Sequence, residues 1–203
     1  MNFRFGQCGS CWAFSITAVV ESLNKIHNNV LVSLSEQELV DCDSRDSGCG
    51  GGFRGWGFDF VKKTGLVPEE YYQYQGMAAQ CRMPSHDLPR VFVDQIYTFD
   101  GDEEEMADWV ATKGPITIGV NVTRGMFAYK SGVFDPTEFD CTTNSLGSHA
   151  LAVIGYGVEK GQKYWLLKNS WGPAHGEAGY IKMRRGVNSC GFAKNVYTAL
   201  ITK

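Results

Sequence analysis

The hydrophobic pattern in the first half of the chain predicts helices. Residues 11 to about 27 are apolar on nearly every face, which is typical of one buried helix. A shorter helix is expected near Ser35 and Glu38, because a serine followed three residues later by a glutamate forms a capping box. Residues 53–63 and 102–112 predict two further helices.

From about residue 116 the pattern changes to alternating and β-branched segments. Strands are expected at residues 116–122, 150–155, 164–168, 180–183 and 196–201. Their alternation fits an antiparallel sheet. A helical first half followed by a strand-rich second half predicts an α+β fold in two lobes, at residues 1–96 and 97–203.

Charge and hydropathy exclude several classes of partner. The 203 residues carry a formal net charge of −3, and no cluster of lysine and arginine is dense enough to bind nucleic acid. No apolar run approaches the roughly 20 residues that cross a bilayer, so no membrane partner is expected. The acidic run at residues 102–105 is interpreted as a solvated helix start, where the helix dipole favours negative charge.

The cysteine count indicates an oxidising compartment. The chain has seven cysteines, so six can pair and one is left over. Asn121-Val122-Thr123 is a glycosylation sequon and agrees with a lysosomal or secreted protein. Because the first residues lack the apolar core of a signal peptide, we expect the chain to be part of a longer precursor.

Cys11 stands at the start of the first predicted helix. The amides of a first helical turn and the positive end of the helix dipole favour a thiolate over a thiol. A thiolate is the attacking form in covalent catalysis, and it needs a base to take its proton. Four histidines could supply that base: His27, His86, His149 and His175.

The surroundings of these histidines differ. His27 is expected to cap the end of the first helix, and His86 lies in a polar loop. His149 follows a flexible segment and precedes an apolar strand, which would place its ring at the edge of a lobe. On spacing alone, a structural role remains the stronger interpretation of any one of them.

Three motifs in this chain resemble those of papain-like cysteine peptidases. The segment Gln7–Ser15 is similar to the nucleophile signature of that family, and it contains Cys11. Ser148–Gly157 is similar to the family's histidine strand, and Tyr164–Gly172 to its asparagine motif. The resemblance covers nearly the whole chain in the family's order. It implies a papain-like fold with a helical left lobe, an antiparallel β-barrel right lobe and the active site in the cleft between them.

The resemblance implies a role for each residue of these motifs. Cys11 would be the nucleophile of a cysteine endopeptidase that forms a covalent acyl-enzyme, and its own backbone N–H would stabilise the oxyanion. His149 would act as general acid and base. Asn169 would orient the His149 ring, and Trp171 would shield their hydrogen bond from water.

Further sites follow from the same resemblance. The implied disulfides are Cys8–Cys49, Cys42–Cys81 and Cys141–Cys190, and the implied substrate-binding residues are Gly51, Gly52, Phe53, Gly119, Ala150, Trp171 and Asn195. Asn195 on the floor of the pocket for the second residue before the cut predicts tolerance of a polar side chain there. The implied partners are a peptide or protein substrate, protein inhibitors and a cleaved propeptide. A monomer without cofactor or metal is expected.

The sequence also departs from the family pattern. Phe5 stands where the family has the glutamine that donates to the oxyanion, and Gln7 is too close to Cys11 to replace it. The first five residues are unlike the family's start, so the chain is interpreted as N-terminally truncated or divergent there. His175 stands where a second tryptophan is usual, and we expect this to loosen the aromatic shelter near Asn169.

Two other interpretations remain. Phe5 favours a catalytically impaired or inactive homologue that keeps the cleft and binds peptides or inhibitors. A cystine-stabilised structural protein would not need a thiol at a helix start, and a redox role for the Cys8–Cys11 pair would need a βαβ unit that the pattern lacks.

Overall fold

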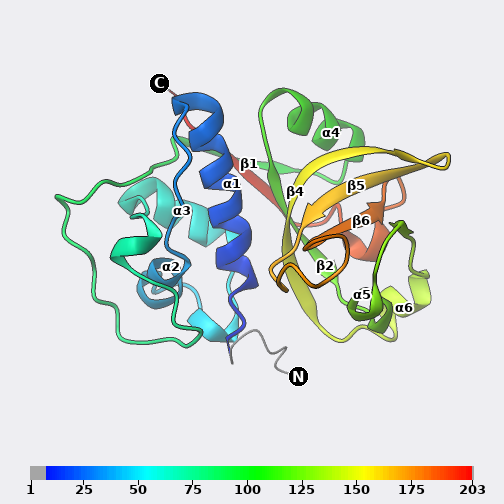
Figure 1. The fold of residues 1–203 in the computed structure, drawn as a ribbon, viewed down its shortest axis with the longest axis horizontal. Helices are drawn as coiled ribbons and strands as arrows, with labels where there is room; N and C mark the ends of the chain where they lie inside the picture. Colours follow the sequence, from blue (N-terminus) through cyan, green and yellow to red (C-terminus); the bar gives the residue numbers. More distant parts are fainter. Residues whose placement is uncertain (1–7, 203) are drawn as a thin grey trace. The chain divides into compact units, whose positions relative to one another are not determined.

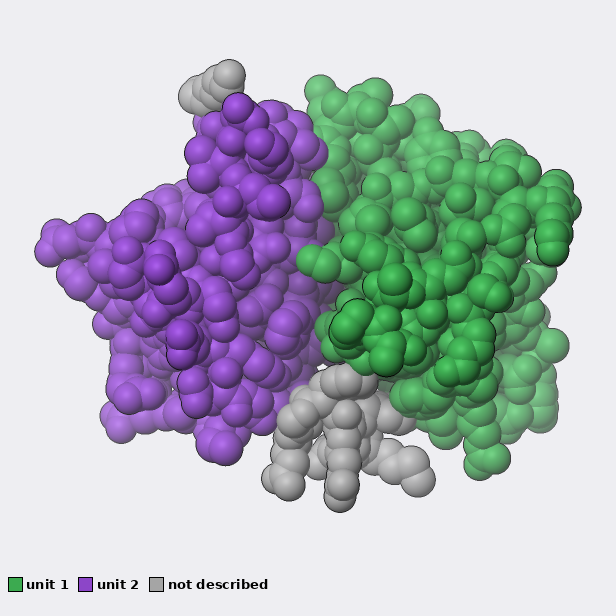
Figure 2. Space-filling model, viewed as in Figure 1, with its two compact units in different colours: residues 1, 98–197 green, residues 2–97, 198–203 purple. Residues whose placement is uncertain are grey.

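The computed structural model describes residues 8–202. The chain divides into two compact units, and Figures 1 and 2 show them. One unit contains residues 98–197, and the other contains the residues up to 97 together with residues from 198 onward.

The first unit is built from helices and long connections. Its helices are α1 (Cys11–Asn28), α2 (Glu36–Cys42) and α3 (Arg54–Thr64), with single 3₁₀ turns at Gly48–Gly50 and Glu69–Tyr71. Helix α1 is buried along most of its length, as its pattern predicts, and α3 packs beside it (Figure 1). The packing is close, because a Cβ on Gly57 would lie 2.4 Å from the Ile16 side chain.

Helix α1 ends differently from the sequence expectation. His27 lies in its last turn, but the residue that caps the helix is Asn29, with a left-handed φ of 58°. Asparagine tolerates this conformation better than most residues, so it can end the helix.

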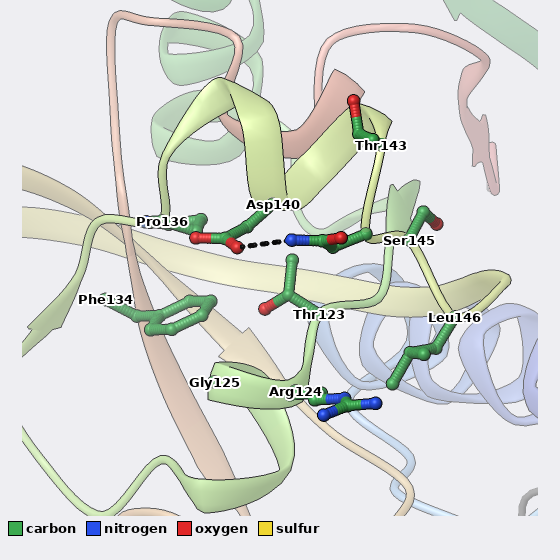
Figure 3. A pocket seen from close by; sticks show the side chains of 10 residues that line it. Thr123, Arg124, Gly125, Phe134, Pro136, Asp140, Thr143, Ser145 and Leu146 are labelled. Carbon is green, nitrogen blue, oxygen red and sulfur yellow. Dashed lines mark hydrogen bonds between the residues drawn. The ribbon is translucent and has the colours of Figure 1, made fainter.

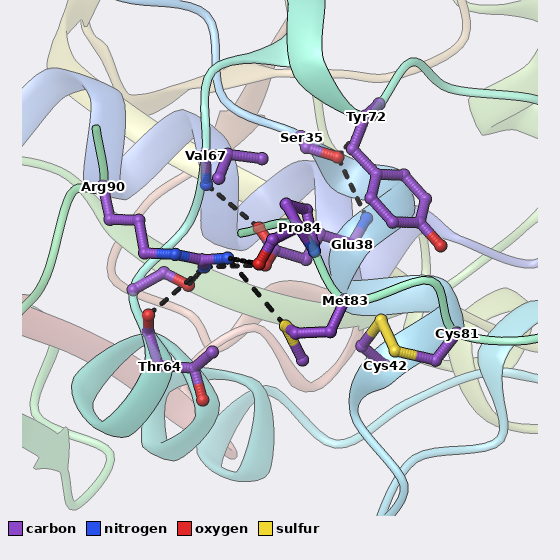
Figure 4. Close-up of polar contacts among 11 residues, drawn as sticks. Ser35, Glu38, Cys42, Thr64, Val67, Tyr72, Cys81, Met83, Pro84 and Arg90 are labelled. Carbon is purple, nitrogen blue, oxygen red and sulfur yellow. Dashed lines mark hydrogen bonds and ion pairs between the residues drawn. A yellow bond between two sulfur atoms is a disulfide. The ribbon is translucent and has the colours of Figure 1, made fainter. Parts of the chain in front are cut away.

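Glu38 connects three parts of the helical unit (Figure 4). The Ser35 hydroxyl accepts the Glu38 N–H, which is one half of the predicted capping box. The Glu38 carboxylate does not complete that box: it accepts the Val67 N–H and pairs with Arg90 at 2.7 Å. Arg90 also donates to the carbonyl oxygen of Thr64 at the end of α3. The irregular segment that carries Arg90 is thereby fixed to both helices.

The strands form one seven-stranded sheet with the order β1-β7-β2-β4-β5-β6-β3. Their bounds are β1 (Gln95–Phe99), β2 (Ile116–Asn121), β3 (Val133–Phe134), β4 (Ser148–Glu159), β5 (Gln162–Lys168), β6 (Tyr180–Arg184) and β7 (Val196–Leu200). The five expected strands are all present, and β4 is longer at both ends than predicted. The sheet is mainly antiparallel, but β3 pairs with β6 in parallel. The division into two units falls within β1 and β7.

Three helices and one 3₁₀ turn accompany the sheet: α4 (Glu103–Thr112), α5 (Arg124–Ala128), α6 (Glu138–Thr142) and Ser189–Gly191. The helix α4 starts at the acidic run as expected, and the Asp102 carboxylate caps it by accepting the N–H groups of Glu104 and Glu105. The solvated interpretation of that run is wrong for Glu103, however. Its buried carboxylate accepts the indole N–H of Trp165 and the backbone N–H groups of Gly186 and Asn188. These bonds link α4 to β5 and to the turn after β6.

The disulfides are Cys8–Cys49, Cys42–Cys81 and Cys141–Cys190. They are the three pairs that the resemblance implies, and they leave Cys11 as a thiol. Within residues 8–202, no helix is both long and apolar enough to span a bilayer.

Candidate active site

The nucleophile candidate is held at the start of α1 by the glycine-rich loop at residues 48–52. The Cys8–Cys49 disulfide joins the two segments, and the Gly9 N–H donates to the Cys49 carbonyl oxygen at 2.8 Å. A side chain at Gly9 would not fit, because its Cβ would lie 2.8 Å from that same oxygen. These contacts fix the backbone immediately before Cys11.

The residue after the cysteine makes a second connection to this loop. The Trp12 indole N–H donates to the Gly48 carbonyl oxygen at 3.1 Å. A Cβ on Gly52 would come within 2.4 Å of the Trp12 ring, so only glycine lets this backbone lie so close. Trp12 is 1% exposed. The first turn of α1 and the loop therefore form one rigid piece.

Cys11 is the first residue of α1 and is partly exposed. The preceding residue, Ser10, hydrogen-bonds to the Tyr74 hydroxyl at 2.5 Å, and the Tyr74 ring meets Phe14 edge to face. Burial raises the pKa of the Tyr74 phenol, so this ring stays neutral beside the thiol. The helix start contributes positive partial charge, which favours the thiolate.

The base candidate lies on β4 in the other unit. His149 faces Val120 of β2 in the antiparallel register, and it is 6% exposed. Its ring atom Nε2 lies 2.8 Å from the Asn169 side-chain oxygen, just beyond the end of β5. The structure therefore brings together the predicted histidine and asparagine through neighbouring strands.

The chemistry of the amide decides which ring nitrogen of His149 carries the proton. An amide oxygen can only accept, so the His149 Nε2 atom must be the donor. In a neutral imidazole, Nδ1 is then the basic atom. The Asn169 oxygen also accepts the Ser170 N–H at 2.8 Å, which holds the amide in this orientation.

Aromatic rings cover this hydrogen bond. Trp171 stacks on the His149 ring with centroids 4.8 Å apart, and Phe127 stacks on Trp171 with centroids 4.6 Å apart. Phe127 belongs to α5, a helix that the hydrophobic pattern did not predict. A five-residue helix is too short to give a periodic signal, so this ring could not be found from the sequence.

Burial sets the charge of His149. The loss of solvent lowers the pKa of His149 to about 4, and the hydrogen bond to Asn169 offsets only part of that effect. The ring is therefore neutral at neutral pH until it takes a proton from another group. A neutral ring whose Nδ1 carries no proton can act as a general base.

His175 does not leave a gap in this arrangement, contrary to the expected loosening. Its ring meets Trp171 edge to face at 4.8 Å. Its Nδ1 lies 3.3 Å from the Asn169 side-chain nitrogen, and its Nε2 lies 2.9 Å from the Met126 carbonyl oxygen. The histidine thus keeps an aromatic contact and adds two polar ones.

The predicted substrate-binding residues lie in both units. Gly119 and Ala150 face each other across β2 and β4. Thr117 of β2 pairs with Tyr197 of β7, so β7 and the preceding Asn195 lie on the other side of β2 from β4. Gly51, Gly52 and Phe53 follow the 3₁₀ turn of the helical unit, where Phe53 is 40% exposed.

Two predictions concern other positions. Asn121, the sequon asparagine, is the last residue of β2 and lies opposite Ser148. Phe5 lies outside the described residues. Neither glycosylation nor the oxyanion substitution is tested by this geometry.

A pocket that sequence analysis did not indicate lies between α5, α6 and the loop before β4 (Figure 3). Thr123, Arg124, Phe134 and Leu146 line it, together with Asp140. Its residues come from short helices, loops and the two-residue strand β3, which carry little periodic signal. Among residues 8–202, no cluster of three or more histidine, cysteine or acidic residues has the geometry of a metal site.

Comparison with known proteins identifies the family. The model of the papain family of cysteine proteases matches residues 4–200. This chain belongs to that family. The KDEL-tailed cysteine endopeptidase CEP2 of Arabidopsis thaliana is 41% identical over 199 residues, which cover 93% of this chain and 53% of that protein. Cathepsin S of Rattus norvegicus is 40% identical over 195 residues, covering 93% of this chain and 58% of that protein.

Solved structures of family members share the fold. The Carica candamarcensis cysteine protease CMS1MS2, solved with E-64, superposes with a TM-score of 0.86 at 37% identity, over 97% of this chain and 90% of that chain. Digestive procathepsin L 3 of Tenebrio molitor gives a TM-score of 0.88 at 35% identity, over 97% of this chain and 64% of that chain. The papain-like α+β fold is thereby confirmed. Against the curated relatives, the chain spans about half of their length, 53% for CEP2.

Proposed function

We propose that this chain is the catalytic part of a cysteine endopeptidase, with Cys11 as nucleophile and His149 as general acid and base. The observation that carries the proposal is the orientation of His149. Its Nε2–H is held by the Asn169 oxygen, which leaves Nδ1 to accept the Cys11 proton. The position of Cys11 at the start of an 18-residue helix supports the thiolate that results.

The reaction proceeds in two displacements. The Cys11 thiolate attacks the peptide carbonyl carbon, and the carbonyl π-electrons move to oxygen, where the Cys11 backbone N–H stabilises the charge. Collapse of this intermediate breaks the C–N bond as the His149 imidazolium protonates the leaving amine. Neutral His149 then takes a proton from water, whose oxygen attacks the thioester. The acid product leaves, and the thiolate is restored.

In this proposal, each predicted lobe contributes different catalytic residues. The lobe at residues 1–96 contributes the nucleophile, and the lobe at residues 97–203 contributes His149 and Asn169. In this proposal, Gly51 and Gly52 hold an extended substrate backbone. The proposed pocket for the second residue before the cut would be lined by Phe53, Gly119, Ala150 and Asn195, and Trp171 would cover the base.

Relatives support proposals about partners. Bromelain of Ananas comosus and the Carica candamarcensis protease are each solved with E-64, so we expect this chain to bind inhibitors of that class. Amb a 11, a ragweed pollen allergen, is solved as a proform, which favours a propeptide here as well. Three disulfides favour a lysosomal or secreted location.

Labelling with E-64 tests the proposed nucleophile. The folded chain is incubated with the epoxide at mildly acidic pH, and intact mass is measured. We expect one adduct per chain on Cys11, because the trapped atom is a thiolate, and none in Cys11→Ala. A folded wild-type chain that takes up no label would overturn the catalytic assignment in favour of an inactive homologue.

The Phe5→Gln variant tests the impaired alternative. If a side-chain donor to the oxyanion is missing, restoring it should raise kcat by about 10²–10³, the usual cost of losing one donor. The rate of E-64 labelling should change little, since epoxide opening forms no tetrahedral oxyanion. Gln7→Ala is the matched control and should leave kcat unchanged. Equal kcat values for Phe5→Gln and wild type would show that the substitution does not limit catalysis.

A further inference from the structure

A chain of hydrogen bonds extends from the proposed base to α5. His149 Nε2 contacts the Asn169 oxygen at 2.8 Å, and the Asn169 nitrogen contacts His175 Nδ1 at 3.3 Å. His175 Nε2 contacts the Met126 carbonyl oxygen at 2.9 Å. All of these residues belong to the unit of residues 98–197.

Only one placement of the protons gives every hydrogen bond in this series one donor and one acceptor. The Met126 oxygen can only accept, so His175 Nε2 must donate to it. A neutral imidazole has one N–H, which leaves Nδ1 of His175 as an acceptor for the Asn169 NH₂ group. The amide oxygen is then turned toward His149. Each donor therefore meets an acceptor only while His175 is neutral.

We propose that His175 is a positioning residue for the catalytic histidine, and that its protonation makes the site sensitive to acid. The inference rests on the proposed function, because it concerns how His149 is oriented for its reaction with Cys11. It assigns a role to a residue that the sequence marks only as a departure from the family's tryptophan.

The loop holds the His175 ring firmly enough for this role. The His175 N–H donates to the Gly172 carbonyl oxygen at 3.2 Å, and its own carbonyl accepts the Gly179 N–H at 2.8 Å. Gly176 has a φ of 59°, and a Cβ there would lie 2.5 Å from the Tyr180 carbonyl oxygen. The backbone therefore turns tightly on both sides of the ring.

A tryptophan at this position could not do the same. The indole N–H is a donor without an acceptor, so it cannot take the hydrogen bond of the Asn169 NH₂ group. His175 keeps an edge-to-face contact with Trp171 and adds that acceptor. Compared with the family's tryptophan, His175 offers a smaller aromatic ring but adds a hydrogen bond that depends on its protonation.

Protonation of His175 would break the pattern. A second proton on Nδ1 would face the Asn169 NH₂ group, donor against donor. Rotating the amide would satisfy His175, but it would turn the NH₂ group toward His149 Nε2–H and the Ser170 N–H. The first arrangement loses the bond from Asn169 to His175 that holds the amide in place, and the second loses the bond between Asn169 and His149 itself.

Charges around His175 are largely balanced. The titratable and charged groups on the neighbouring elements are Arg124, Tyr129, His149, Glu159, Glu177, Tyr180 and Lys182. Glu177 lies in the same loop, and its carboxylate pairs with Lys182 at 3.0 Å and accepts from the Tyr129 hydroxyl. Lys182 also pairs with Glu159 at 2.6 Å.

The experiment compares pH profiles of kcat/KM for the wild type, His175→Gln and His175→Phe. Glutamine can accept and donate without titrating, whereas phenylalanine keeps a ring without an acceptor. As the pH falls, kcat/KM of the wild type should drop with the binding of two protons. In both variants it should drop with the binding of one proton. At neutral pH, His175→Phe should lower kcat by about 2- to 10-fold, the worth of one hydrogen bond, and His175→Gln should restore most of it.

The exposed His86 provides the control: His86→Gln should keep the wild-type profile. An acid limb that is the same in His175→Gln as in the wild type would overturn the inference. If His175→Phe does not fold, the acid limb of the His175→Gln profile still tests the inference.

A second readout separates this inference from the proposed function. In nitrogen-15 spectra, the side-chain NH₂ signal of Asn169 should shift with pH in the wild type and stay constant in His175→Gln. Turnover and E-64 labelling without that shift would refute the role of His175 and leave the protease intact. A shift in a chain that neither turns over substrate nor takes label would refute the function instead.

Discussion

Replacement of His149 by alanine should lower kcat/KM by about 10³–10⁵ near neutral pH. Without an imidazolium beside it, more of the Cys11 side chain stays as the weakly nucleophilic thiol, which costs about tenfold. Losing the general acid that protonates the leaving amine costs a further factor of about 10²–10⁴. The measurement is kcat/KM for a peptide substrate, together with the rate of thiol alkylation.

The residual activity of His149→Ala should also have a distinct pH dependence. Burial lowers the pKa of His149 to about 4, so the wild-type ring is neutral before it takes the thiol proton. In the variant, alkylation should rise with pH until the thiol ionises on its own.

His86→Ala is the matched control, because His86 is exposed in an irregular segment. It should leave kcat/KM within the error of the wild type. A folded His149→Ala variant with more than a tenth of the wild-type activity would contradict the role of His149 as the base.

Much of the fold could be predicted from local patterns. The buried face of α1 and the five expected strands follow from periodicity, since each pattern extends over several turns or alternations. The Ser35 cap and the Asp102 cap also follow, because a side chain that bonds to the backbone two or three residues later is a local event.

What could not be predicted depends on partners far away in the sequence. Glu38 has the spacing of a capping box, but its carboxylate binds Arg90, 52 residues later. Glu103 stands in an acidic run that suggests solvent, yet it accepts the Trp165 N–H across 62 residues. A carboxylate in either place has the same local signal whether it is solvated or buried.

The candidate site shows the same division. Cys11, His149 and Asn169 were found because their motifs resemble a known family, and the hydrogen bond between the last two agrees with the implied orientation. The role of His175 could not be found in this way. It depends on the Met126 carbonyl in a short helix, which no motif marks.

Breaking the ion pair between Glu38 and Arg90 should have the largest effect on stability. The side chains are 0% and 4% exposed, with 2.7 Å between the charged atoms. The Arg90→Met variant leaves the Glu38 carboxylate buried without its cation, although the Val67 N–H still donates to it. Removing one partner of such a pair usually costs about 3–5 kcal/mol, so we expect the free energy of unfolding to fall by about that amount.

A double variant separates the ion pair from the packing around it. Glu38→Gln with Arg90→Met removes both charges, and it should be more stable than Arg90→Met because no uncompensated charge stays buried. Asp59→Asn is the matched control, since its pair with Arg45 at 3.0 Å is partly exposed and should be worth less than about 1 kcal/mol. Urea unfolding with the disulfides intact measures all four proteins. If Arg90→Met loses no more stability than Asp59→Asn, the pair does not hold α2, the end of α3 and the irregular segment together.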